Sequence, residues 1–278
     1  MNVRLQRLSL YGFIGICFVW LLHLTWFRWG NLFGDTFRDQ WIFYQLTRGK
    51  ILYKDIFYFY GFLPPYLIAF LYRLLGVSIQ WAAYGGMVVT VVTSVSIYRI
   101  GRLFFQRALA TLLVLHFLFF FAFGDYGTGG VCNFIIPYSI ASTFCTMFIL
   151  WSLYCFLKYL KCEKVFYLRC WMMLAACAFF SRIDYSFLIW LVSFLIGAVH
   201  SVFYKQYRRI GYFIVVPCIA VTGYALFIIA NNAFEGFNEE KKKTNSYFIQ
   251  NLSYLDCEAS HGLFKVYNNN IMFSIQNY

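Results

Sequence analysis

The residues best suited to chemistry lie together in one stretch, "FGDTFRDQWIFYQLTRGKILYKDIFYFYGFLPPY", residues 33–66. It follows an apolar run and contains three carboxylates and four cations: Asp35, Asp39, Asp55, Arg38, Arg48, Lys50 and Lys54. A carboxylate within hydrogen-bond reach can take a proton from an attacking hydroxyl group. Cations can stabilise negative charge that develops on a leaving group. The stretch therefore supplies candidates for a general base and for an anion-binding site.

The composition places these residues at the edge of a membrane. Hydrophobic residues make up 62% of the chain and charged residues 12%, whereas soluble domains carry about 25% charged residues. The net charge is +12, but no basic helix, zinc finger or RNA-binding signature accompanies it, so we expect no nucleic-acid partner. The nine cysteines form no C-x-x-C pair and the four histidines are isolated, so we expect neither a disulfide framework nor a metal site.

The fold class that follows is an all-α transmembrane bundle. A spanning helix needs about 20 mostly apolar residues. The segments that qualify predict about seven spans, at 8–27, 78–98, 104–123, 139–160, 166–182, 185–204 and 210–230. The run 65–75 is too short to span and is expected to be re-entrant or interfacial. Residues 28–77 then form a large first outer loop, and the polar residues 231–278 form an extracytoplasmic tail.

The charges predict the orientation. With the N-terminus inside, the cytoplasmic pieces hold twelve of the 23 Lys and Arg residues and one acid, Glu163. Short basic loops are retained in the cytoplasm, so we expect a multi-pass protein with a cytoplasmic N-terminus.

The first outer loop is expected to begin with an amphipathic helix on the membrane surface. Asp35 can start this helix and Gly49 can end it. Asp35, Arg38 and Asp39 then lie on one face, since they are spaced at i, i+3 and i+4. A structural role remains open for each, because Asp35 can cap the helix and Asp39 can form a salt bridge with Arg38.

The second half of the loop carries a sequence pattern that resembles that of a known family. The acid after the first span, then "GKILYKD", then "YGFLPPY", resembles the polytopic GT-C glycosyltransferases, which include protein O-mannosyltransferase-like and aminoarabinose-transferase-like enzymes. The block "GVCNFIIPYSIASTF", residues 130–144, is similar to the segment that opens the fourth helix of bacterial members. The resemblance covers about residues 1–230, which correspond to the catalytic module that members share. The chain departs from the aminoarabinose-transferase-like pattern by lacking a lysine before the proline in this loop.

The resemblance implies that a sugar passes from a polyprenyl-phosphate carrier to an extracytoplasmic glycan, lipid or protein, without a cofactor although a divalent cation is conceivable. We expect this to happen at the bacterial inner membrane, in the synthesis of a cell-envelope glycan. It assigns Asp35 as general base, with Asp39 as the rival, and Arg38 as a phosphate ligand. Lys50 and Lys54 are weaker phosphate candidates.

Later segments add two candidates to this site. Asp125 lies in the second outer loop, where it is either near the site or solvated, and Arg182 at a helix end either meets a lipid phosphate or pairs with Asp184. The alternatives to a transferase are a lipid-carrier or small-molecule transporter, or an inactive truncated remnant of such an enzyme.

Overall fold

The computed structural model describes residues 3–26, 35–124 and 133–231, and the side chains of all of these except 3–8 and 35–37. The described chain is helical, without a strand, and an isolated bridge joins Leu52 to Ile56. The predicted all-α class is therefore confirmed for this part of the chain. The predicted tail, residues 231–278, lies outside the described residues apart from its first residue.

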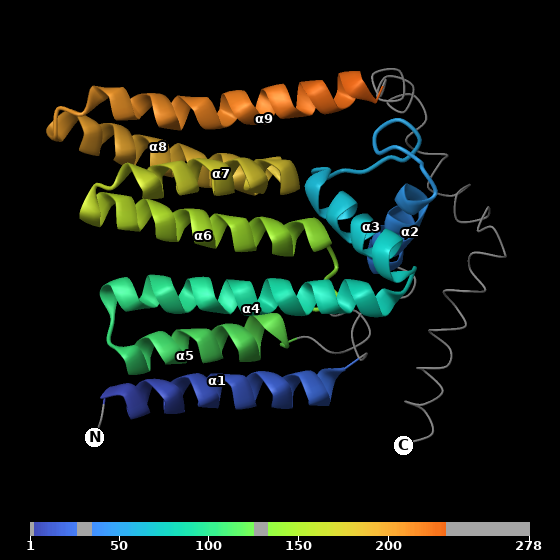
Figure 1. The fold of residues 1–278 in the computed structure, drawn as a ribbon, viewed down its shortest axis with the longest axis horizontal. Helices are drawn as coiled ribbons and strands as arrows, with labels where there is room; N and C mark the ends of the chain where they lie inside the picture. The colour runs from blue at the N-terminus through green and yellow to red at the C-terminus, as the bar shows by residue number, and fades with distance from the viewer. Residues whose placement is uncertain (1–2, 27–34, 125–132, 232–278) are drawn as a thin grey trace.

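Seven helices lie side by side with nearly aligned axes (Figure 1). They are α1 (Val3–Thr25), α4 (Ile79–Phe104), α5 (Arg107–Phe117), α6 (Ile140–Cys162), α7 (Val165–Ser181), α8 (Ile183–Phe203) and α9 (Ile210–Ala230). A π-helical turn, Leu118–Ala122, continues α5, and a 3-10 turn, Tyr207–Arg209, precedes α9. Each of the seven overlaps one predicted span.

Four of these helices are long and apolar enough to cross a bilayer: α4, α6, α8, and α9 with its preceding turn. The last has a mean hydropathy of 2.4, yet only 17% of its most apolar window is buried inside the protein. A helix that is apolar all round and so little covered by protein needs lipid around it. The chain is therefore an integral membrane protein. The corresponding apolar segments of α1, of α5 with its π-helical turn, and of α7 are shorter, at Ser9–Thr25, Arg107–Ala122 and Val165–Ser181, so seven spans remain a prediction.

Two short helices, α2 (Asp35–Thr47) and α3 (Leu63–Leu75), cross one end of the bundle (Figure 1). The described part of α2 begins at Asp35, and Gly49, with φ of 87°, follows the end of the helix. Pro64 and Pro65 occupy the first turn of α3, where a missing amide hydrogen costs no helical hydrogen bond. The helix predicted over 65–75 thus exists and begins two residues earlier.

A buried apolar face holds α2 against α3. The side chains of Ile42, Phe43 and Leu46 are almost fully buried in a cluster that includes Tyr72 of α3. The Tyr72 hydroxyl group donates to the side-chain oxygen of Gln40. Thus α2 packs on protein along this face, in addition to any contact with the membrane surface.

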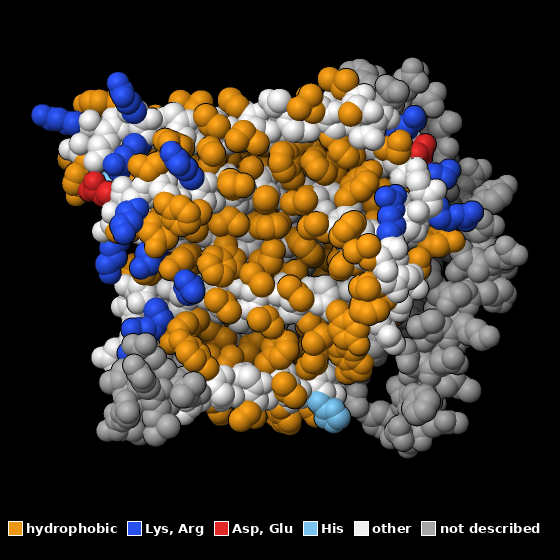
Figure 2. All heavy atoms as spheres, viewed as in Figure 1, with side chains coloured by type: hydrophobic (Ala, Val, Ile, Leu, Met, Phe, Trp, Pro, Cys, Tyr) orange, Lys and Arg blue, Asp and Glu red, His pale blue; other side chains and the backbone are white. Residues whose placement is uncertain are grey.

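The opposite end of the bundle is basic. Figure 2 shows Lys and Arg side chains gathered along the end away from α2 and α3. They lie in the helix ends and turns where α4 meets α5, α6 meets α7, and α8 meets α9, and the described ones are Arg99, Arg102, Arg107, Lys158, Lys161, Lys164, Arg169, Lys205, Arg208 and Arg209. The predicted clustering of these cations at one end of the bundle is thereby confirmed, and that this end is cytoplasmic stays a prediction.

Gly61 docks the loop between α2 and α3 onto the bundle. Its amide donates to the Ser181 carbonyl oxygen at 3.0 Å. A Cβ atom at this position would lie 1.9 Å from the Phe180 carbonyl oxygen, so only glycine allows the approach. The loop is consequently held against the junction of α7 and α8.

Replacing Gly61 with alanine should destabilise this docking. A rigid backbone carbonyl cannot move aside, so we expect a cost of about 1–3 kcal/mol and a lower Tm for the purified protein in detergent. Gly15→Ala in α1 is the matched control, because nothing lies within 4 Å of its Cβ position. An unchanged Tm for Gly61→Ala would show that the loop does not dock as described.

Candidate functional site

The carboxylate of Asp39 lies at the N-terminus of α6. One oxygen accepts a hydrogen bond from the Ile140 amide at 3.3 Å, and the other lies 3.3 Å from an Arg38 guanidinium nitrogen. The Asp39 side chain is 2% exposed. The amide groups of a helix N-terminus carry partial positive charge, which stabilises a buried carboxylate. The first outer loop is thereby tied to a helix that begins about a hundred residues later.

Tyr58 lies beside this ion pair. Its side chain is 4% exposed, and its hydroxyl group is hydrogen-bonded to no other described residue. Burial raises the pKa of Tyr58 well above its usual value, and the negative charge of Asp39 raises it further, against a smaller opposing effect of Arg38. The phenol therefore stays protonated at neutral pH and can donate a hydrogen bond.

Arg182 lies between α7 and α8 and reaches the first turn of α6. Its guanidinium group donates three hydrogen bonds of 2.9–3.0 Å to the carboxylate of Asp184, and a further one to the Ser142 hydroxyl group. It also lies over two aromatic rings, 4.7 Å from the centre of Tyr60 and 4.1 Å from that of Tyr185. The pairing of Arg182 with Asp184 considered from sequence is thus present.

The guanidinium group of Arg182 keeps donor capacity for a ligand. It has five N–H groups, and its contacts with Asp184 and Ser142 leave one N–H on each terminal nitrogen. Its side chain is 18% exposed. Such a planar, fixed group suits an anion with two oxygens, such as a phosphate.

The block around residues 133–144 places the N-terminus of α6. The Asn133 side-chain oxygen accepts from the Ile136 amide at 2.8 Å, which closes the turn before the helix. The Ile135 carbonyl group packs on Gly86 of α4, where a Cβ atom would be 2.0 Å away. Ile140 and Ser142, the partners of Asp39 and Arg182, lie two residues apart in the first turn that follows. The two charged groups therefore converge on one helix end.

The other predicted candidates are placed differently. Asp35 is the first residue of α2, one turn before Asp39, but its side chain lies outside the described part, as does Asp125 entirely. Lys50 and Lys54 are exposed in the loop. The guanidinium group of Arg48 lies 5.9 Å from the ring centre of Tyr44, one turn earlier in the chain. Arg48 directly follows α2, so it is placed as a charge at the end of that helix.

The acid Asp55, by contrast, has a local structural role. Its carboxylate accepts from the Ile51 amide at 2.8 Å, and its own amide donates to the Ile51 carbonyl oxygen at 2.9 Å. Asp55 therefore closes a turn within the loop.

Sequence reasoning missed the tyrosines of the site. In "FYFYG" the residues alternate: Phe57 and Phe59 are exposed, whereas Tyr58 and Tyr60 point inward. Period-two alternation is the signal that could have revealed an extended segment with one inward face. The role of Ser142 had no comparable signal, because it depends on how α6 meets Arg182.

Asp39→Ala should destabilise the protein strongly. It removes a buried carboxylate from a guanidinium group and a helix amide, and breaking a buried pair costs about 3–5 kcal/mol. Thermal unfolding in detergent measures this effect. Asp55→Ala, which removes an exposed carboxylate from the same loop, should cost no more than about 1 kcal/mol. Equal losses for the two variants would contradict the distinct role of Asp39.

A comparison with protein-family models finds a family that matches the chain. The model of the family described as dolichyl-phosphate-mannose-protein mannosyltransferase matches residues 61–224, which is more than half of the chain. The matched range includes Arg182 and begins after Asp35, Arg38 and Asp39. No curated protein and no solved structure matches the chain.

Proposed function

Because the chain belongs to the dolichyl-phosphate-mannose-protein mannosyltransferase family, which consists of membrane glycosyltransferases of the GT-C type, we propose that it transfers a sugar from a polyprenyl-phosphate carrier to a hydroxyl group outside the cytoplasm. The acceptor belongs to a glycan, a lipid or a protein. The membrane is the bacterial inner membrane. The observation that carries this proposal is the convergence of Asp39, Tyr58 and Arg182 around the first turn of α6.

The place of this convergence fits a lipid-linked donor. It lies at the end of the bundle that carries α2 and α3, where the polar head of a carrier would meet the protein while its prenyl tail stays in lipid (Figure 1). At the basic end the cations face the cytoplasm under the positive-inside rule. The site end then faces outward.

We assign the general base to Asp35 and a positioning role to Asp39. The Asp39 carboxylate is 2% exposed and accepts from both Arg38 and the Ile140 amide, which suits an anchor better than a group that must receive a proton. One helical turn separates the two residues, so their α-carbons are about 6 Å apart along the axis. Anchoring Asp39 therefore fixes where Asp35 stands.

The transfer then proceeds as an inverting displacement. Asp35 removes the proton from the acceptor hydroxyl group as its oxygen forms a bond to the anomeric carbon. The bond between that carbon and the phosphate oxygen breaks, and the phosphate leaves with the electron pair. Arg182, with its two remaining N–H groups, stabilises the charge on the departing phosphate, and Arg38 is the second cation for it. In this scheme the guanidinium groups do the electrostatic work without a cofactor.

Mass spectrometry of lipid extracts from cells lacking the gene tests the reaction. We expect a polyprenyl-phosphate sugar to accumulate and to be cleared when the intact chain is restored. Asp35→Asn should slow clearance in isolated membranes by about 100-fold or more, the usual contribution of a general base. Arg182→Lys keeps the charge but loses the planar donors, so a loss of about 10- to 100-fold is expected.

The matched control is Asp55→Asn, the same chemical change at a turn-closing residue of the same loop. It should clear the lipid at the rate of the intact chain. If Asp35→Asn does so too, the base is misassigned. If no such lipid accumulates without the gene, the donor class is wrong and a transporter or an inactive remnant becomes the better interpretation.

A separate measurement, cysteine labelling, tests the proposed orientation. Single cysteines at Lys54 and Lys205 of a cysteine-free variant report the two ends, since both residues are exposed. A membrane-impermeant thiol reagent applied to intact spheroplasts should label the Lys54→Cys variant and spare Lys205→Cys until the membrane is opened. The reverse pattern would place the site in the cytoplasm and exclude the proposed acceptor side.

A further inference from the structure

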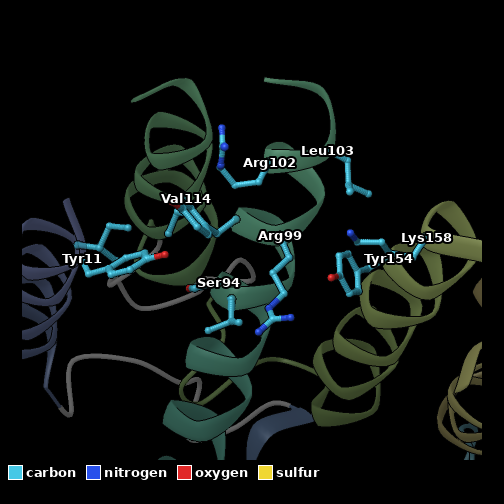
Figure 3. Close-up of a pocket in the computed structure, with 11 residues that line it drawn as sticks. Tyr11, Ser94, Arg99, Arg102, Leu103, Val114, Tyr154 and Lys158 are labelled. Carbon is cyan, nitrogen blue, oxygen red and sulfur yellow. The ribbon is translucent and has the colours of Figure 1, made fainter. Parts of the chain in front are cut away.

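A cavity lies at the basic end of the bundle, remote from the proposed catalytic site. It has a volume of about 480 Å³ and lies among α1, α4, α5 and α6. Its polar lining comes from three cations and four other polar side chains: Arg99, Arg102, Lys158, Tyr11, Tyr98, Tyr154 and Ser94. Figure 3 shows Tyr11 and Tyr154 on opposite sides of α4, which carries the two arginines.

The three cations lack acidic partners within the described residues. Arg99 lies over the rings of Trp151 and Tyr154, each at 5.8 Å, and Arg102 donates to the Phe105 carbonyl oxygen at 2.6 Å. The ion pairs of the described chain involve other arginines. Three positive charges thus surround one hollow without a carboxylate to neutralise them.

The three cations come from neighbouring turns of two helices that line the cavity. Arg99 and Arg102 are three residues apart on α4, and Tyr154 and Lys158 are four apart on α6, so each pair shares one face of its helix. Clustering around a hollow between helices goes beyond the positive-inside rule, which requires only that cations lie in the loops.

The cavity also extends away from the charges towards the apolar middle of the bundle. Ser94 lies eight residues before Arg102 on α4, a rise of about 12 Å along the axis. Between these levels the wall is mostly apolar and includes Ile14, Val95 and Val114, with the hydroxyl group of Tyr98 beside them. The cavity therefore has cations towards the end of the bundle and a mostly apolar wall towards its middle.

We propose that this cavity binds an anionic phospholipid, with its phosphate at Arg99, Arg102 and Lys158 and the start of an acyl chain along Ile14, Val95 and Val114. Charge complementarity selects the anionic headgroup, because basic pockets between membrane helices favour anionic lipids. Tyr154, one helical turn from Lys158 on α6, can donate a hydrogen bond to a phosphate oxygen. The site is separate from the sugar-transfer site, and only its assignment to the cytoplasmic leaflet rests on the proposed orientation.

Native mass spectrometry of the full chain in mild detergent tests this site by titration with phosphatidylglycerol. The test variant is Arg102→Gln/Lys158→Gln, which leaves the packing of Arg99 on Trp151 intact. We expect binding about 30-fold weaker, at roughly fivefold for each cation removed. The matched control is Lys205→Gln/Arg208→Gln, which removes the same charge from exposed positions at the same end outside the cavity. It should bind as the intact chain does.

A third variant separates the cavity from the charge. Val95→Trp fills the hollow without changing a charge and should also abolish retention of the lipid. Circular dichroism and gel filtration of every variant establish that each is folded before its affinity is compared.

Two further ligands complete the test. Phosphatidylcholine with the same acyl chains should bind at least tenfold more weakly than phosphatidylglycerol, and soluble glycerol phosphate should not compete with it. Equal binding of the two lipids, or an equal loss in the Lys205→Gln/Arg208→Gln control, would overturn the proposal. If soluble glycerol phosphate does compete with phosphatidylglycerol, the site binds a phosphate ester without needing an acyl chain. That result would overturn the proposed role of the acyl chain.

Discussion

The hydrogen bond between Asp39 and the first amide of α6 is the contact on which the arrangement of the site depends. It joins a helix at the bundle end to the start of a long apolar helix, across a separation in the chain of 101 residues. A buried carboxylate is stable there because a helix N-terminus and a guanidinium group both face it. The carboxylate orients α2, and the same turn of α6 holds Ser142 towards Arg182. The first turn of α6 therefore positions both Asp39 and Arg182.

The glycine contact at Gly61 completes this arrangement from the other side. The loop approaches the backbone of Phe180 and Ser181 so closely that it cannot shift without moving the end of α7. Tyr60, the residue before, then lies under the guanidinium group of Arg182. Local backbone fit and cation–π attraction thus act at neighbouring residues, and together they define one rigid wall of the site.

How much of this could be predicted from the sequence depends on whether the signal is local. The apolar runs predicted the position of every long helix, and Asp35 and Gly49 predicted the bounds of α2, because capping and hydrophobic length depend on neighbouring residues. The local ion pairs of Asp39 with Arg38 and of Arg182 with Asp184 were open alternatives from sequence and are present. The partners on α6 could not be predicted, since Ile140 and Ser142 become neighbours only when α6 is placed against the loop. The end of α4 was also underestimated, because its last turn continues through Arg99 and Arg102 beyond the apolar core.

The concentration of cations at one end of the bundle has an electrical consequence. Cell membranes are negative inside, and moving one elementary charge across such a membrane costs about 2.3 kcal/mol per 100 mV. In the proposed orientation these cations lie on the favourable side of that potential, and an inverted chain would have to carry all of them across. The membrane voltage would therefore act together with the loop charges at insertion, and an energised membrane would orient the chain more strictly than a depolarised one.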